Sequence, residues 1–140
     1  MADFYEIDAG TNKISKEILD QCFYIHTKLG PGLLESVYEE CLFYFLSRKN
    51  LKVERQKILP INIDGLVIPS GLRLDVVVEN KVIVELKAVE RILPVHEAQV
   101  HSYLKLSGFS LGLLINFNVK SLKDGIRRIA MAQNQKNNFV

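Results

Sequence analysis

Three ionisable residues, Asp75, Glu85 and Lys87, stand in two adjoining runs that favour β-strands. The runs cover residues 72–79 and 81–88 and are rich in β-branched side chains, which is typical of paired strands. Successive side chains of a strand point to opposite faces, so Glu85 and Lys87 share a face. Two carboxylates beside a lysine could hold a divalent cation, because hard cations such as Mg²⁺ take oxygen ligands.

The length of the turn between the two strands decides whether Asp75 joins that face. A three-residue turn over residues 79–81 gives one apolar face and sets Asp75 opposite Glu85, with Cβ atoms roughly 5 Å apart. On the apolar face, Leu74, Val76 and Val78 then match Leu86, Val84 and Val82. A two-residue turn would mix polar and apolar positions, and register follows the buried pattern. We therefore predict the three-residue turn, while a solvated strand face without a ligand remains the alternative.

The composition is typical of a globular chain. Its 140 residues are 48% hydrophobic, so we expect a single domain over residues 1–140, with flexible ends at 1–12 and 132–140. No apolar run reaches the ~18 residues of a membrane span, and the first residues have no signal-peptide pattern. Cys22 and Cys41 have no metal-binding spacing, so we expect reduced cysteines in a cytoplasmic protein.

The net charge of +2 is too small to indicate nucleic-acid binding, but the cations are unevenly distributed. The C-terminal third has few acids and six cationic residues, Lys105, Lys120, Lys123, Arg127, Arg128 and Lys136. These form either a solvated helix face or a phosphate-binding patch.

Hydrophobic periodicity predicts two helices in the first third of the chain. The first ends at Gly30-Pro31-Gly32, and the second runs from about Leu33 to Lys49. Strand-like sequence follows from about Lys52 to Ile63, and Asp64-Gly65 predicts a tight hairpin after it. Pro69-Ser70-Gly71 predicts a turn before the two strands that carry the ionisable residues.

The second half of the chain predicts a strand–helix–strand unit. Pro94 opens a helix that ends at Gly108. The apolar run from Leu111 to Phe117 predicts a strand buried on both faces and parallel to the strand before that helix. A last helix is predicted to begin near Ser121. The whole is an α/β fold, a mixed sheet with helices on both faces.

Three further side chains are candidates for the same site. Glu35 stands in the first turn of the second helix, where the helix dipole also favours an acid. Gln99 and Tyr103 are four residues apart and share a face of the helix after Pro94. An ordinary helix edge is the alternative interpretation of this pair.

The run Gly32-Leu-Leu-Glu35-Ser-Val-Tyr38 resembles the G-x-x-E-x-x-Y signature of the GxxExxY proteins, a family placed in the PD-(D/E)XK nuclease superfamily. The likeness extends from about His26 to Ile129, through L-R-L-D, V-I-V-E-L-K-A-V-E and H-E-A-Q-V-H-S-Y-L. It implies a restriction-endonuclease-like αβββαβ core. The proline of the superfamily's name has no counterpart before Asp75.

The resemblance implies a metal centre and a role for each residue in it. Asp75 and Glu85, with the backbone carbonyl of Leu86, would hold Mg²⁺ or Mn²⁺. Glu35 would complete this centre as a further catalytic and metal-ligating carboxylate. Lys87 would orient the attacking water and offset phosphate charge.

The resemblance also implies that Gln99 and Tyr103 position the substrate. His26, Tyr38 and His96 match no catalytic position of the superfamily. Tyr38 is expected to pack and to anchor its helix.

The predicted function is metal-dependent hydrolysis of phosphodiester bonds in nucleic acid, with DNA favoured as the partner. The alternative is a non-catalytic, nuclease-like binding module that acts with a protein or nucleic-acid partner. A third reading is a structural domain whose acidic cluster binds nothing. Because the chain is small, a homodimer or a larger protein partner could be needed to hold a duplex. No membrane partner is expected.

Overall fold

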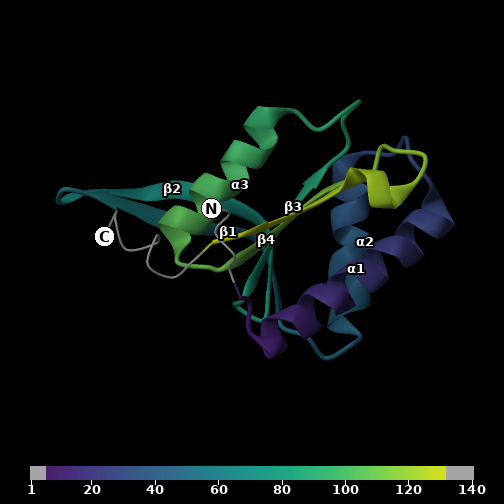
Figure 1. Ribbon diagram of the computed structural model, residues 1–140, viewed down its shortest axis with the longest axis horizontal. Helices are drawn as coiled ribbons and strands as arrows, with labels where there is room; N and C mark the ends of the chain where they lie inside the picture. Colours follow the sequence, from purple (N-terminus) through teal and green to yellow (C-terminus); the bar gives the residue numbers. More distant parts are fainter. Residues whose placement is uncertain (1–5, 132–140) are drawn as a thin grey trace.

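The computed structural model describes residues 6–131 and shows a five-stranded sheet between two layers of helices (Figure 1). Helices α1 (Ala9–Leu29) and α2 (Glu35–Ser47) pack on one face, and α3 (Pro94–Ser107) packs on the other. Each face has its own buried hydrophobic cluster. The predicted α/β fold, a mixed sheet flanked by helices on both faces, is therefore confirmed.

The sheet has the strand order β1-β2-β3-β4-β5 and contains both strand directions. Strands β1 (Val53–Ile63), β2 (Leu66–Val78) and β3 (Val82–Lys87) are antiparallel neighbours. Strand β4 (Leu111–Asn116) runs parallel to β3, and β5 (Ile126–Ala130) is antiparallel to β4. The parallel β3–β4 pair joined by α3 is the predicted strand–helix–strand unit, and every residue of β4 is buried.

The turn between β2 and β3 has the predicted three residues, because Val78 pairs with Val82 across residues 79–81. The predicted apolar face is wrong at one position. Leu74 packs in the cluster beneath α3, whereas Val76 packs in the cluster beneath α1 and α2. The β2–β3 pairing begins only at Val76, so the strand twists away from its partner at Leu74.

The turn predicted at Pro69-Ser70-Gly71 is wrong, since these residues lie inside β2. The β1–β2 register shifts between Leu59 and Ile61, opposite this stretch. A bulge tolerates proline in a strand because the regular ladder is interrupted there. Gly71 is needed for a close approach, because a Cβ at this position would lie 2.4 Å from the Ile61 side chain.

The helix predicted near Ser121 is also wrong. The chain forms a short 3₁₀ turn, Leu122–Gly125, and then the edge strand β5. The i, i+3 spacing of Ile126 and Ile129 matches one face of a helix, whereas in the strand these two residues pack on opposite faces of the sheet. A Cβ at Gly125 would lie 2.2 Å from the Asn116 carbonyl oxygen, so the turn packs directly against the end of β4.

Helix α1 begins earlier than predicted. Asp8 caps it by accepting a hydrogen bond from the Thr11 N–H at 2.8 Å. Residues 9–12 are therefore helical and do not belong to a flexible end, while the end predicted at 132–140 lies outside the described residues. Within residues 6–131, no helix combines the length and apolar character needed to cross a membrane.

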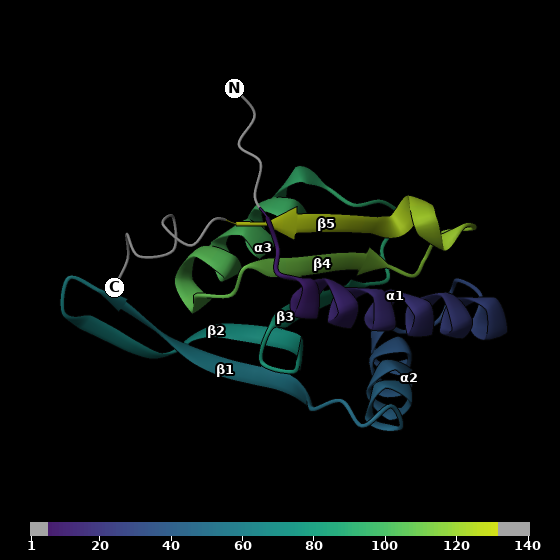
Figure 2. The ribbon, with the colours of Figure 1, turned by 60° about the horizontal axis from the view of Figure 1, so that its bottom comes forward.

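The outer half of the β1–β2 hairpin extends away from the helices (Figure 2). We call residues 58–71 the arm. The pairs Ile61–Ile68 and Ile63–Leu66 place four aliphatic side chains on one face of it. Leu66 is 60% exposed, which shows how little of this surface the fold covers.

Candidate active site

The candidate site lies where β2 and β3 separate. The β2–β3 pairing extends as far as Val76 and Val84. Where the next backbone pair would follow, the Leu86 N–H donates to Asp75 Oδ2 at 3.1 Å. The Asp75 carboxylate thus replaces a backbone acceptor, and the Leu86 N–H keeps a partner although the ladder has ended.

The carbonyl of Leu86 is directed to the same side as its N–H, because both groups of a strand residue project to one neighbour. On the opposite side of β3, the Lys87 carbonyl accepts from the Phe117 N–H at 2.9 Å. The backbone N–H and carbonyl of Lys87 therefore point towards β4, and those of Leu86 point towards β2. This places the Leu86 carbonyl on the Asp75 side of the strand.

Glu85 is a buried carboxylate at this point of the sheet. Its side chain is 3% exposed, and within the described part of the chain its Oε1 atom has no hydrogen-bond partner. Burial and then the neighbouring Asp75 raise the pKa of Glu85 to about 10, against the opposing charge of Lys87. At neutral pH the metal-free protein therefore keeps a proton on Glu85, and a cation would be the partner that the ionised form lacks.

Glu35 approaches from the helical layer opposite α3. Its side chain is exposed at the start of α2, yet partial desolvation and the charge of Asp75 raise its pKa, while Lys87 lowers it. Both Asp75 and Lys87 therefore lie within electrostatic reach. Within residues 6–131, however, no three His, Cys, Asp or Glu side chains are gathered closely enough to hold a metal ion. The metal-ligand role of Glu35 stays a prediction.

Lys87, Gln99 and Tyr103 form a chain of polar contacts from β3 to α3. The Lys87 ammonium lies 3.5 Å from Gln99 Oε1, at the outer limit of a hydrogen bond, and Gln99 Nε2 donates to the Tyr103 hydroxyl at 3.0 Å. Burial and then the charge of Glu85 raise the pKa of Tyr103. The structure thus brings both α3 side chains to the carboxylates.

The residues present fit a divalent metal ion. Mg²⁺ usually takes one or two protein carboxylates and completes its shell with water. Asp75 and Glu85 supply two carboxylates, and the Leu86 carbonyl is directed to the same side. The unpartnered Oε1 of Glu85 is the observation that favours a cation here.

A half-buried ion pair that the sequence did not reveal holds α2 against β1. Glu39 is 9% exposed and accepts from Arg55 at 3.0 and 3.2 Å and from Gln56 at 2.6 Å. Gln56 has a φ of 49° and falls opposite Asp75 in the β1–β2 register. The pair therefore connects the helix that carries Glu35 to β1, the strand next to the one that carries Asp75. The only sequence signal was a second glutamate one helical turn after the first.

Asn116 is a second residue that sequence reasoning missed. It is 1% exposed at the end of β4, where its side chain accepts from the Val89 N–H at 3.0 Å and donates to the Val89 carbonyl at 2.9 Å. These two bonds hold the loop that follows Lys87. A polar residue at the end of an apolar run was the available signal.

The G-x-x-E-x-x-Y run has a clear structural basis. Gly32 has a φ of 96°, which glycine adopts without strain. The Tyr38 hydroxyl donates to the Gly30 carbonyl at 2.7 Å and accepts from the Leu33 N–H at 3.2 Å, and its ring stacks on Phe117 at 4.4 Å. Tyr38 therefore anchors the turn before α2, as predicted, and this turn sets the position of Glu35.

Two of the C-terminal cations bind protein groups. Arg127 pairs with Glu97 at 3.3 Å, and Arg128 donates to the Ser15 hydroxyl of α1 at 3.1 Å. Both stand on β5, so the predicted helix face does not exist. Lys136 lies outside the described residues.

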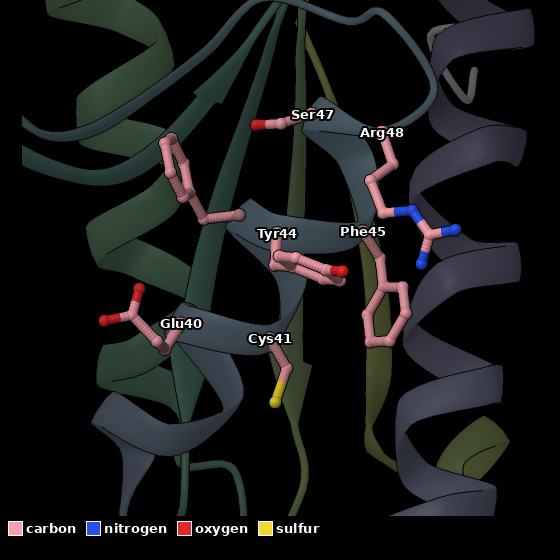
Figure 3. Close-up of a pocket in the computed structure, with 7 residues that line it drawn as sticks. Glu40, Cys41, Tyr44, Phe45, Ser47 and Arg48 are labelled. Carbon is pink, nitrogen blue, oxygen red and sulfur yellow. The ribbon is translucent and has the colours of Figure 1, made fainter.

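Two open hollows on the surface of residues 6–131 are candidates for a substrate groove. One of about 810 Å³ follows the outer side of α2 and contains none of the candidate residues (Figure 3); it is lined by Glu40, Cys41, Phe43, Tyr44, Phe45, Ser47 and Arg48. The other, of about 450 Å³, adjoins the candidate site and is lined by Lys87, Val95, His96, Ala98, Gln99 and Ser102. Only the second shares residues with the site, so it is the better candidate for a substrate groove.

Comparison with known protein families matches residues 12–129 to the PD-(D/E)XK nuclease superfamily. The match covers all five strands except the last residue of β5. Searches of curated proteins and of solved structures gave no match. The mixed five-stranded sheet is consistent with this match, and the chain belongs to the PD-(D/E)XK nuclease superfamily.

Proposed function

We propose that this protein is a metal-dependent nuclease that hydrolyses phosphodiester bonds, with DNA as the favoured substrate. The observation that supports this most is Glu85, which is buried beside Asp75 with one oxygen unpartnered. Burying such a group costs stability unless a cation or a proton neutralises it. A purely structural domain gains nothing from this arrangement, whereas a metal-dependent enzyme requires it.

In the proposed reaction, Asp75, Glu85 and the Leu86 carbonyl hold Mg²⁺ or Mn²⁺. The bound ion supplies an activated water and offsets the charge of the phosphate. Lys87 lies on the same strand face as Glu85 and stabilises the negative charge that develops on the phosphate. Glu35 completes the site from α2.

Gln99 and Tyr103 act as positioning residues in this proposal. The Gln99 amide bridges the Lys87 ammonium and the Tyr103 hydroxyl, so it restricts where the ammonium can lie. Fixing a charged group before the reaction reduces the reorganisation that the transition state requires.

We also propose that the chain is a member of the GxxExxY family within the superfamily. The support is that Gly32 and Tyr38 form the turn that sets the position of Glu35. The cytoplasmic location and the single domain over residues 1–140 stay predictions.

A non-catalytic binding module is the second candidate. The arm favours it, because exposed aliphatic surface on an edge hairpin is typical of protein–protein contacts. A homodimer or a larger protein partner would then cover this surface. The two functions are compatible, since the arm lies outside the candidate site.

A metal-titrated cleavage assay tests the proposed function. Wild-type protein should degrade labelled DNA with Mg²⁺ or Mn²⁺ and stop when the ion is chelated. Asp75→Asn and Glu85→Gln should be inactive, while Asp64→Asn at the exposed tip of the arm should be active as the matched control. Equal cleavage by all three variants would show that the nuclease lies elsewhere or is a contaminant. A parallel RNA substrate decides which nucleic acid is preferred.

A further inference from the structure

The hollow beside the candidate site is lined by hydrogen-bond donors and by no carboxylate. Lys87, His96, Gln99 and Ser102 are its polar residues. The nearest acid on this part of α3, Glu97, does not line it and pairs with Arg127 at 3.3 Å. A cavity with this lining suits an anion. At about 450 Å³ it also lies within the size range of ordinary small-molecule sites.

His96 is held in one orientation and one tautomer. Its Nδ1 accepts a hydrogen bond from the Leu93 N–H at 2.9 Å. In the neutral ring the proton must then be on Nε2, which makes this atom a donor. Because the bond to Leu93 already fixes the ring, a ligand that accepts from Nε2 orders little additional side chain.

Lys87 connects this hollow to the carboxylates. It lies on the same strand face as Glu85, it opposes the raised pKa of that residue, and it also lines the hollow. Successive phosphates of one strand are close neighbours, so one strand could place a phosphate in the hollow and the next one at the carboxylates, with Lys87 near both. The exposed Val95 side chain offers an apolar contact for the sugar between them.

We propose that this hollow binds a backbone phosphate of the nucleic-acid strand, adjacent to the phosphate that is cleaved, and that His96 is a positioning residue that donates to it. The inference rests on the proposed nuclease function and specifies how the strand is held. It assigns a role to a residue outside the Asp75, Glu85 and Lys87 motif.

The decisive variant is His96→Asp. An aspartate at this position still accepts from the Leu93 N–H and is favoured by the helix dipole, so α3 should keep its stability. It removes the donor, however, and places a negative charge in the hollow. His101→Asp is the matched control, because it makes the same charge change on the same helix at an exposed position that does not line the hollow.

Binding of fluorescein-labelled single-stranded DNA to metal-free protein measures the hollow without requiring cleavage. We expect His96→Asp to weaken binding by about tenfold or more, the size of a lost charge-assisted hydrogen bond. His101→Asp should stay within about twofold, because screening weakens distant surface charges. His96→Asn, which retains both an acceptor and a donor, should stay close to wild type. Melting temperatures of the variants check that the fold is retained.

Cleavage kinetics provide the second readout. In His96→Asp, KM should rise while kcat changes little, whereas Glu85→Gln should lose kcat. Equal DNA binding by His96→Asp and wild type would overturn the inference, as would a wild type that binds no DNA. A wild type that binds DNA through His96 but cleaves nothing would instead overturn the nuclease function and leave the phosphate site standing.

Discussion

The candidate site and the arm depart from the usual distribution of side chains in opposite ways. At the site, the sheet buries the carboxylate of Glu85, whereas in the arm it exposes aliphatic side chains such as Leu66. The buried carboxylate has specific neighbours, Asp75 and Lys87, and these support the proposal that a cation binds it. The exposed side chains of the arm belong to neither buried cluster of residues 6–131, so they indicate a contact surface without identifying what covers it. A side chain with unusual burial for its polarity therefore indicates a specific function only when its neighbours are also known.

Strand β2 runs through both regions, yet the two regions should respond differently to substitution. Asp75 stands in its inner half, and the arm contains its outer half. If the comparison is correct, changes at the inner end remove activity and changes at the outer end do not.

The largest expected effect is on cleavage. Glu85→Gln should lower kcat by about a thousandfold or more, because it removes a charge that the transition state requires. Ile68→Thr in the arm should leave kcat within about twofold, measured under the same Mg²⁺ concentration. An arm variant that loses cleavage as completely as Glu85→Gln would show that the arm belongs to the active site, for example through dimerisation.

The next effect is on stability. Ile83→Ala, at a fully buried position of β3, should reduce the free energy of unfolding by about 2–5 kcal/mol. Ile68→Ala in the arm, where the side chain is 42% exposed, should cost less than about 1 kcal/mol. Denaturant titration of both variants measures the difference. A large cost at Ile68 that grows with protein concentration would reveal a covered arm and a self-associating protein.

The strands around the candidate site and the strands of the arm have similar aliphatic sequences, so the sequence predicts strands in both regions. The turn over residues 79–81, the helix after Pro94 and the buried strand from Leu111 follow from local pattern and from turn chemistry. The arm does not, since alternating aliphatics predict a strand but not whether anything covers it. The residues Pro69-Ser70-Gly71 predict a turn when they are considered alone. The bulge that lets them stay in the strand depends on the pairing with β1, which the local sequence does not show.

The site was predictable as a set of residues and not as a geometry. Asp75, Glu85 and Lys87 could be placed on one strand pair by register alone. The sequence does not show that the β2–β3 pairing ends at Val76 and Val84, and this end is what frees the Leu86 N–H for Asp75. The Glu39–Arg55 ion pair joins residues distant in sequence, and no local pattern predicts it.

Metal binding should stabilise the site end of the molecule, and the effect should depend on pH. An ion that binds only the folded protein adds about 2.7 kcal/mol at a hundredfold excess over its dissociation constant. Glu85 must lose its proton to bind the ion, and its pKa is raised to about 10. The rise in melting temperature with Mn²⁺ should therefore be larger in weakly alkaline than in weakly acidic buffer. Asp75→Asn should abolish most of it, and an arm variant such as Ile68→Thr should retain it.

The smallest expected effect concerns the metal-free protein. Glu85 has a folded-state pKa above its ordinary value of 4.5, so its contribution favours the fold below that pH and is lost as pH rises towards about 10. Glutamine does not ionise, so Glu85→Gln removes the loss of stability that rising pH causes. It should stabilise the metal-free protein at neutral pH by on the order of 1–3 kcal/mol. Glu90→Gln, at an exposed position in the loop after β3, is the control and should change nothing. Chemical denaturation at several pH values measures both. The advantage of the glutamine should disappear below about pH 4.5, where the glutamate is protonated in both folded and unfolded protein. A constant advantage at all pH values would mean that Glu85 is poorly packed and not electrostatically strained, and the comparison with the arm would then lose its basis.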